Sequence, residues 1–323
     1  MKEEEEVRPA GGIAPAYADI LYRHPMRFRD LVASDWKNKL TNHYKLYQYL
    51  IHGLGQDIRT IDVPRLSKEN VAVGTLSTFL KRIEVSTKKL KPYVKSGDDL
   101  VLTNWTKGSP FVFEKSQALG LDKRWGVYPD VTASDCSFDG IYASTEGIVD
   151  PDVIPVRAIT IKATYTYSVG ARKMPTETEV KLAHRIREDA NEYGASTGRP
   201  RDIVNIDLPM LSYLAKISKA THLVITHLDV CYLDQPVKVC VGYRKGNKSV
   251  DYRPDQEYLN NITPEYIQID PWDRVALEKV SKIKDLPRNA KIYCEFLSRA
   301  LGLNLLMVTV GPGRGQTLRW FKS

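Results

Sequence analysis

Short apolar runs alternate with helical patterns over the later two thirds of the chain. Four runs have the length and composition of buried strands: residues 111–113, 156–161, 222–226 and 305–309. Three helical patterns cover residues 175–193, 208–219 and 289–301. Thr176 suits the N-cap of the first, Pro209 suits the first turn of the second, and Gly302 ends the third. Helices that alternate with buried strands predict an α/β fold with a mostly parallel central sheet flanked by helices.

The first third of the chain lacks this alternation. Residues 17–55 are rich in Tyr, His and Leu and indicate helices joined by loops, while residues 56–108 contain many lysines and show weak periodicity. We interpret the latter as an exposed helical excursion. No low-complexity linker separates independent domains, so residues 1–323 are expected to form a single domain. Within it, 17–108 would be mainly helical and 109–323 would be the α/β portion.

Composition narrows the class of protein. The 42% of hydrophobic and 27% of charged residues are those of a soluble globular chain. A net charge of +8 with dispersed basic residues suits phosphorylated small molecules and makes nucleic acid an unlikely partner. No apolar stretch has the length of a membrane helix, and residues 1–6 do not resemble a signal peptide. Four widely spaced cysteines indicate neither disulfides nor zinc, which favours the cytoplasm; Cys231, Cys240 and Cys294 are expected to be buried packing residues.

Two segments carry candidate chemistry. Residues 194–201 offer the hydroxyls of Ser196 and Thr197 and the guanidiniums of Arg199 and Arg201, a set that suits a ligand rich in oxyanions. Asp229 lies just past the carboxyl end of the strand predicted at 222–226, where open α/β sheets bind ligands. A carboxylate there can accept hydrogen bonds from the two donors on the edge of guanine.

In this order and spacing the two segments resemble the adenylosuccinate synthetase family, GTP-dependent ligases that join L-aspartate to IMP. Four further stretches are similar to family motifs: Gly12-Ile-Ala-Pro-Ala-Tyr17 with the downstream Arg23, Glu114–Gln117 with Gly126–Ser134, Val169-Gly170 leading to Pro175-Thr-Glu177, and Val308–Arg314.

The resemblance implies a role for each matched residue. IMP would be bound by Arg23, Gln117, Thr132, Val169 and Arg199, with Gln117 also catalytic and Arg23 reaching the IMP of a neighbouring subunit. L-aspartate would be bound by Ser196, Thr197 and Arg199. GTP would be bound by Arg201, His227, Asp229, Thr309, Gly311 and Pro312. Without the resemblance, each of three residues has an ordinary structural interpretation. Arg23 would be a surface arginine, His227 would be a histidine at the end of a strand, and Gly311 would belong to a common type of turn.

Several positions depart from the family pattern. Ala14, Lys115 and Ala118 replace glycines, and Arg172-Lys-Met174 replaces a Gly-Pro-Phe segment. The family's Gly-Asp-Glu-Gly-Lys-Gly-Lys loop and Asn-Ala-Gly-His segment have no counterpart, and no Gly-x4-Gly-Lys pattern follows any strand.

The resemblance therefore implies an N-terminally truncated fold related to P-loop NTPases, inactive alone or completed by a separate N-terminal partner. It also implies a cytoplasmic homodimer and a need for Mg²⁺, whose ligands are not in this chain. The alternatives are a noncatalytic purine-nucleotide-binding relative and a ligase acting on another purine monophosphate.

Overall fold

The computed structural model describes residues 13–24, 26–64, 69–169, 172–194 and 198–320. The chain divides into two compact units, a helical unit of Ala14–Pro110 and an α/β unit that contains Phe111–Ser323. We describe each unit by itself.

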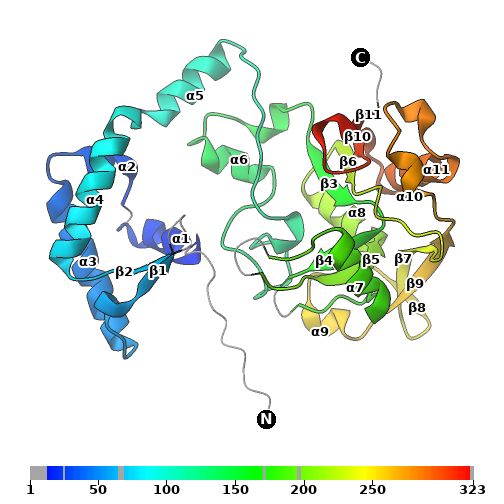
Figure 1. Cartoon of the computed structure of the whole chain (residues 1–323), viewed down its shortest axis with the longest axis horizontal. Helices are drawn as coiled ribbons and strands as arrows, with labels where there is room; N and C mark the ends of the chain where they lie inside the picture. Colours follow the sequence, from blue (N-terminus) through cyan, green and yellow to red (C-terminus); the bar gives the residue numbers. More distant parts are fainter. Residues whose placement is uncertain (1–12, 25, 65–68, 170–171, 195–197, 321–323) are drawn as a thin grey trace. The chain divides into compact units, whose positions relative to one another are not determined.

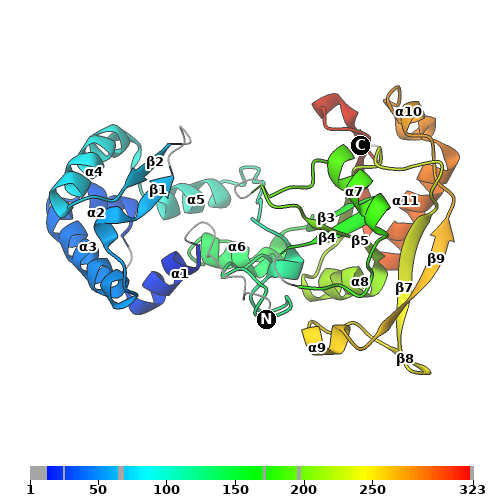
Figure 2. The same cartoon turned by 60° about the horizontal axis from the view of Figure 1, so that its bottom comes forward.

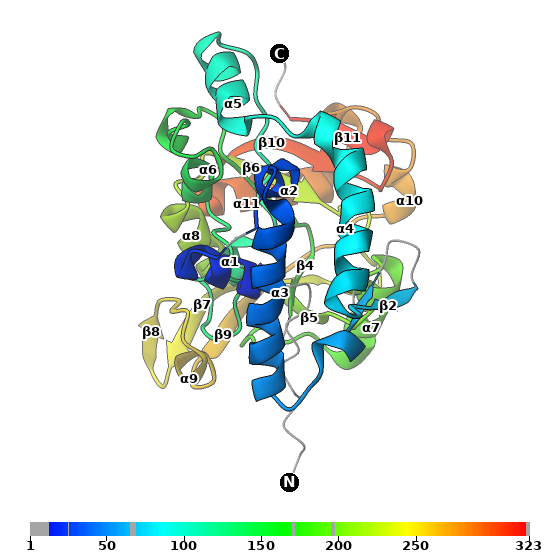
Figure 3. The same ribbon diagram turned by 90° about the vertical axis from the view of Figure 1, so that its left-hand side faces the viewer.

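The helical unit is built on two long helices that lie side by side (Figure 3). Its elements are α1 (Ile13–Tyr22), α2 (Phe28–Val32), α3 (Trp36–Gly53), β1 (Asp62–Pro64), β2 (Asn70–Ala72), α4 (Leu76–Leu90) and α5 (Gly97–Thr106). Tyr44 of α3 packs its ring 5.6 Å from that of Phe79 of α4, and the Thr75 hydroxyl caps α4 by accepting from the Thr78 amide. The helices predicted over 17–55 and 56–108 are confirmed, but the sequence did not predict the antiparallel hairpin β1–β2.

The first sheet of the α/β unit has the strand order β11-β10-β6-β3. Its strands are β3 (Ala158–Lys162), β6 (His222–Thr226), β10 (Asn304–Thr309) and β11 (Thr317–Arg319). The three predicted strands β3, β6 and β10 run parallel, as expected, and β11 is antiparallel to β10 (Figure 1). The strand predicted at 111–113 is wrong: Phe111 and Phe113 stack on each other, and Val112 between them is 96% exposed. The two rings contact each other, and the three residues do not join a sheet.

The second sheet is mixed, and the sequence pattern predicts none of its strands. It holds β4 (Tyr165–Ser168), β5 (Asp202–Asp207), β7 (Val237–Lys245), β8 (Lys248–Val250) and β9 (Thr263–Ile269), with only β5 and β7 parallel (Figure 2). Asn205 and Asp207 interrupt the apolar pattern of β5, yet both are buried. The Asn205 amide group donates to the Glu177 carbonyl at 2.8 Å, which compensates its burial.

The helices of the α/β unit are α6 (Asp139–Ser144), α7 (Val180–Asp189), α8 (Leu208–Ile217), α9 (Gln256–Leu259), α10 (Arg274–Leu277) and α11 (Arg288–Leu301). The predictions for α8 and α11 are confirmed, including Gly302 in the left-handed region at φ 65°. Thr176 is not the N-cap of α7, which begins four residues later. Its carbonyl instead accepts from the backbone amide of Asn205 at 2.8 Å. The segment that precedes α7 therefore lies along β5.

The main core lies where α8 and α11 pack on each other and on β7 and β10. The buried Tyr293 hydroxyl of α11 donates to the Ala163 carbonyl just past β3 at 2.6 Å. Cys231, Cys240 and Cys294 are buried free thiols, as expected. Over the described ranges, every helix is too short or too polar to span a membrane.

Asp207 begins α8 as its N-cap. Its carboxyl accepts from the Met210 amide at 3.1 Å, from the Thr176 hydroxyl at 3.4 Å and from the Tyr243 hydroxyl. The side chain is fully buried, and burial raises the pKa of Asp207 to about 6 despite these hydrogen bonds. The N-terminus of α8 is therefore capped by a carboxyl group that loses its proton near pH 6.

Candidate functional site

The carboxyl ends of β6 and β10 are tied together by backbone contacts. Directly after β6, His227 adopts φ 58° and its amide donates to the Thr309 hydroxyl at 3.2 Å. The Leu228 amide donates to the Thr309 carbonyl at 3.1 Å. Because the two strands are parallel, these residues and Asp229 lie at one edge of the sheet. The predicted position of Asp229 past the strand end is therefore confirmed.

Asp229 and the turn after β10 complete this edge. The Asp229 side chain is half-buried, and within the described part of the chain its carboxylate accepts no hydrogen bond. Gln316 closes the turn by accepting from the Gly313 amide at 2.8 Å. A methyl group at Gly311 would meet the amide group of the Gln316 side chain, which would have to shift to make room. Pro312 follows and is exposed. Among the residues that the structure describes, this edge therefore combines a carboxylate that has no protein donor with a tight turn.

A buried carboxylate joins two cationic side chains beside this edge. Glu192, which lies between α7 and β5, is 1% exposed. It accepts from the Lys162 ammonium at 2.7 Å, from the Arg201 guanidinium at 2.5 Å and from the Tyr165 hydroxyl at 2.6 Å. Burial alone would raise the pKa of Glu192, but the hydrogen bonds from Lys162 and Tyr165 outweigh it and lower that pKa. Glu192 is therefore ionised at neutral pH.

The same lysine reaches His227. The Lys162 ammonium lies 3.3 Å from His227 Nε2, and the Tyr165 ring meets the imidazole edge-on. Burial, then the charge of Lys162, lowers the pKa of His227, so the imidazole is neutral at pH 7. An ammonium only donates, so Nε2 accepts and the ring proton is on Nδ1. In the described part of the chain that buried Nδ1 has no hydrogen-bond partner.

Gln117 and Thr132 meet through a third side chain. The Ser134 hydroxyl donates to Gln117 Oε1 at 3.0 Å and lies 3.2 Å from the Thr132 hydroxyl. Buried Asp122 holds this loop by accepting from the Cys136 and Arg124 amides at 2.6 and 2.9 Å. Gln117 and Thr132, which the family motif places fifteen positions apart, are thus neighbours in space. The described residues directly before Gln117 do not form the strand that the sequence predicts there.

A cavity of about 600 Å³ opens beside these groups. Its wall contains Gln117, Val169 and Lys162, while α8 contributes Met210, Leu211 and Leu214. Buried Arg172 also lines it and donates to the Gly120 carbonyl at 2.8 Å and to the Ser168 hydroxyl at 3.1 Å. Cavities of this size, largely apolar with a few polar groups, accommodate ligands as large as nucleotides.

The remaining predicted residues fall in three places. Ser196 and Thr197 lie outside the described residues. Arg199 is exposed on the loop that follows them, where its carbonyl accepts from the Gly194 amide at 2.8 Å. Arg23 belongs to the helical unit, directly after α1, with a left-handed φ of 64°. The roles of all these residues stay predictions.

Three polar residues at the site escaped the sequence analysis: Lys162, Tyr165 and Glu192. Lys162 ends an otherwise apolar strand, a signal that could have singled it out. Glu192 carries no such local signal, because its partners are 9 to 30 positions away along the chain.

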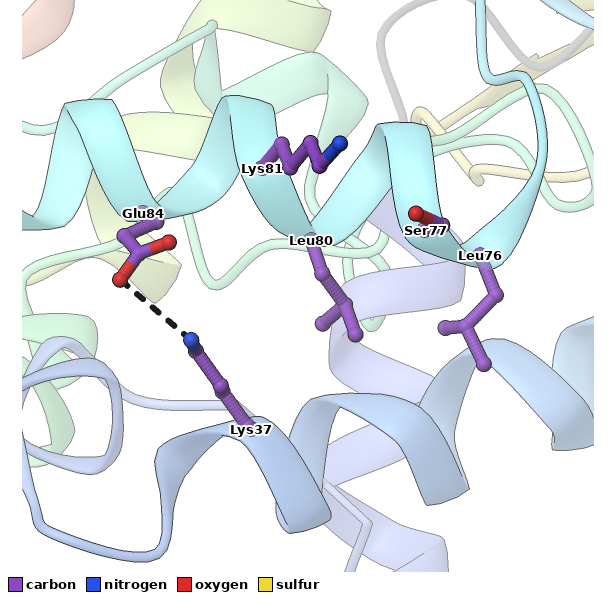
Figure 4. A pocket seen from close by; sticks show the side chains of 6 residues that line it. All are labelled: Lys37, Leu76, Ser77, Leu80, Lys81 and Glu84. Carbon is purple, nitrogen blue, oxygen red and sulfur yellow. Dashed lines mark ion pairs between the residues drawn. The ribbon is translucent and has the colours of Figure 1, made fainter.

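A second cavity, of about 460 Å³, lies between α3 and α4 of the helical unit (Figure 4). Leu76 and Leu80 of α4 face it, and the Lys37 ammonium of α3 pairs with Glu84 at 3.3 Å on its rim. Residues with a predicted substrate role do not line it.

Comparison with known proteins agrees with the resemblance found in the sequence. The adenylosuccinate synthetase family profile matches residues 5–318. The adenylosuccinate synthetase of Acetivibrio thermocellus is 32% identical over 309 residues, covering 95% of this chain and 69% of the relative. That of Thermodesulfovibrio yellowstonii is 31% identical, with shares of 95% and 68%.

A solved structure shares the fold. The fully ligated adenylosuccinate synthetase of Plasmodium falciparum superposes with a TM-score of 0.84 at 22% identity, over 96% of this chain and 69% of the other. From the family profile, the sequence relatives and this fold, the chain belongs to the adenylosuccinate synthetase family, ligases of purine biosynthesis.

Proposed function

We propose that this chain binds IMP, L-aspartate and GTP and takes part in joining the first two into adenylosuccinate. In the family's reaction GTP phosphorylates the purine O6, and the aspartate amine then displaces phosphate. The observation that carries the proposal is the position of Asp229, His227 and Thr309 at one sheet edge, with Lys162 connecting that edge to the cavity.

The cavity is proposed to hold the purine of IMP. Gln117 Oε1 is occupied by the Ser134 hydroxyl, and within the described residues its Nε2 makes no hydrogen bond. An amide donor at the cavity wall is suited to the purine O6, the atom to be phosphorylated. The apolar wall from Val169 and α8 would pack on the base and exclude water from it.

Asp229 is proposed to select guanine. Its carboxylate can accept from the N1–H and the exocyclic amine of guanine, whereas adenine has no N1–H and carries its amine elsewhere. His227 would pack on the base as a neutral imidazole, in keeping with its lowered pKa. Thr309, Gly311 and Pro312 would close the turn over the base, and Gly311, which has no side chain, would allow a close approach.

The loop at 194–201 is proposed to bind the dicarboxylate. Arg199 would pair with a carboxylate of L-aspartate, aided by the hydroxyls of Ser196 and Thr197. Arg201 would lie toward the GTP phosphates. Its guanidinium stacks 4.3 Å above the Tyr167 ring and pairs with Glu192, so it is already held in one orientation.

Mg²⁺ is proposed to arrive with the GTP phosphates, which coordinate it readily. Over the described ranges, groups of three or more His, Cys, Asp or Glu side chains that could hold a metal ion do not occur. We therefore derive no step through a metal held by these residues. A cytoplasmic homodimer is proposed on the family's use of Arg23 across a subunit interface.

Calorimetric titration tests this function. Adenylosuccinate and GTP should each bind the 323-residue chain saturably, with GTP tighter than ATP and adenylosuccinate tighter than succinate. Binding of none of these purine ligands would contradict the proposal. Tighter binding of another purine monophosphate than IMP would instead favour the variant ligase.

A further inference from the structure

The cluster of Lys162, Glu192 and Arg201 holds more positive charge than its own pairing requires. One carboxylate neutralises one of the two cations, so the three ionised groups keep a net charge of +1. The Lys162 and Arg201 side chains remain 20% and 25% exposed, whereas the Glu192 side chain is 1% exposed. The carboxylate is therefore buried beneath the two cationic groups, and both cationic groups are partly exposed to solvent.

The cluster is rigid as well as charged. Tyr165 supplies a third donor to Glu192 at 2.6 Å. The Tyr167 ring lies under both cations, 4.3 Å from the Arg201 guanidinium and 5.7 Å from the Lys162 ammonium. A buried carboxylate with three donors fixes the direction of each donor, and fixed donors bind an anion without a further loss of side-chain entropy.

The position of the cluster links three parts of the site. Lys162 lines the cavity and reaches His227 at the sheet edge. Arg201 directly precedes β5 at the end of the loop that carries Arg199, and its amide donates to the Glu192 carbonyl at 3.0 Å. The cluster therefore lies where the cavity, the sheet edge and the loop meet.

We propose that Lys162 is a further substrate-binding cation and that Glu192 is a positioning residue, which holds Lys162 and Arg201 as a pair for one oxyanion of the substrates. The proposal rests on the function proposed above. The oxyanion is a carboxylate of L-aspartate or a phosphate of a nucleotide, two groups that such a pair of donors recognises alike.

Two variants and one control test the proposal by calorimetry with GTP, IMP, adenylosuccinate and inorganic pyrophosphate. Glu192→Gln keeps the size of the side chain but presents an amide donor to one of the cations. Lys162→Met keeps the length of the lysine and removes its charge. Glu188→Gln is the matched control, because Glu188 is a carboxylate one turn away that pairs with Tyr193 and touches neither cation.

Both site variants should lose about tenfold or more in affinity for the ligand whose oxyanion the pair binds. The other ligands and the control should change little. Selective weakening of adenylosuccinate identifies a carboxylate, and selective weakening of GTP or IMP identifies a phosphate. The double variant should lose less than the product of the two single losses, because both changes dismantle one unit. A purely structural Glu192 would weaken all ligands equally and lower the melting temperature.

Unchanged affinity of Lys162→Met for all four ligands overturns the proposal, whether or not Glu192→Gln folds. If the loss of affinity in the double variant equals the product of the two single losses, the positioning role of Glu192 is refuted. Pyrophosphate separates this proposal from the function itself. If the parent binds pyrophosphate in a Lys162-dependent way but binds no purine ligand, the proposed function fails and the oxyanion site stands.

Discussion

Asp207→Asn should change how the stability of the α/β unit depends on pH. Asp207 is the buried N-cap of α8, the helix that forms one wall of the cavity. Asparagine keeps the shape, and its Oδ1 can accept from the Met210 amide. Its amide nitrogen takes the place of the oxygen that accepts from Thr176 and Tyr243, and can donate to both hydroxyl oxygens. The substitution therefore removes the titration of the group and leaves each of the three partners a hydrogen-bonding atom.

The magnitude follows from the two pKa values. The folded carboxyl has a pKa of about 6, against 3.8 for the ordinary group. Between these values the folded state binds more protons than the unfolded state, so the free energy of unfolding falls as the pH rises and levels off above about pH 6. Two pKa units at about 1.4 kcal/mol each give a loss of about 3 kcal/mol in the parent. Asp207→Asn does not show this loss, because asparagine does not titrate.

Urea unfolding at several pH values measures the effect. The free energy of unfolding of Asp207→Asn minus that of the parent should rise by about 2–3 kcal/mol from pH 4 to pH 7. Asp202→Asn, at the exposed start of the same strand, is the control and should give a flat difference. A flat difference for Asp207→Asn as well would refute the raised pKa and the reasoning from burial.

Three further predictions concern the ligands and turnover. Asp229→Asn places an amide donor toward the guanine donors and should weaken GTP by about 1–3 kcal/mol while leaving ATP unchanged; equal effects on both in calorimetry would contradict guanine readout. Arg199→Lys loses the planar fork and should weaken adenylosuccinate by about 1.5–3 kcal/mol, whereas Arg201→Lys should act more on GTP; the reverse pattern in titrations would exchange the two roles. Finally, the 323 residues alone should release no phosphate from GTP with IMP, L-aspartate and Mg²⁺; sustained release would show that they contain catalytic groups which the sequence analysis did not recognise.

The sequence predicted best those features that depend on local pattern. The runs at 222–226 and 305–309 are regular enough to identify parallel strands, and parallel strands bring their carboxyl ends together. The proximity of Asp229 and Thr309 follows directly from the parallel arrangement of β6 and β10. Pro209 in the first turn of α8 and Gly302 at the C-cap of α11 follow from the same kind of local pattern.

Other features depend on contacts between distant residues. β5 was missed because Asn205 and Asp207 look like loop residues until the partners that compensate their burial are known. The start of α7 was misplaced because Thr176 serves β5 instead of the helix. Lys162 and Glu192 are 30 positions apart, and no spacing rule connects a strand-end lysine with a glutamate before a loop.

The decisive measurement is a crystal structure of this chain with adenylosuccinate bound. The purine should lie in the cavity lined by Gln117, Val169 and Lys162, with the succinyl carboxylates on the loop at 194–201 and within hydrogen-bonding distance of Arg199. Adenylosuccinate bound in the cavity between α3 and α4, or at a surface away from the ends of β6 and β10, would contradict the account.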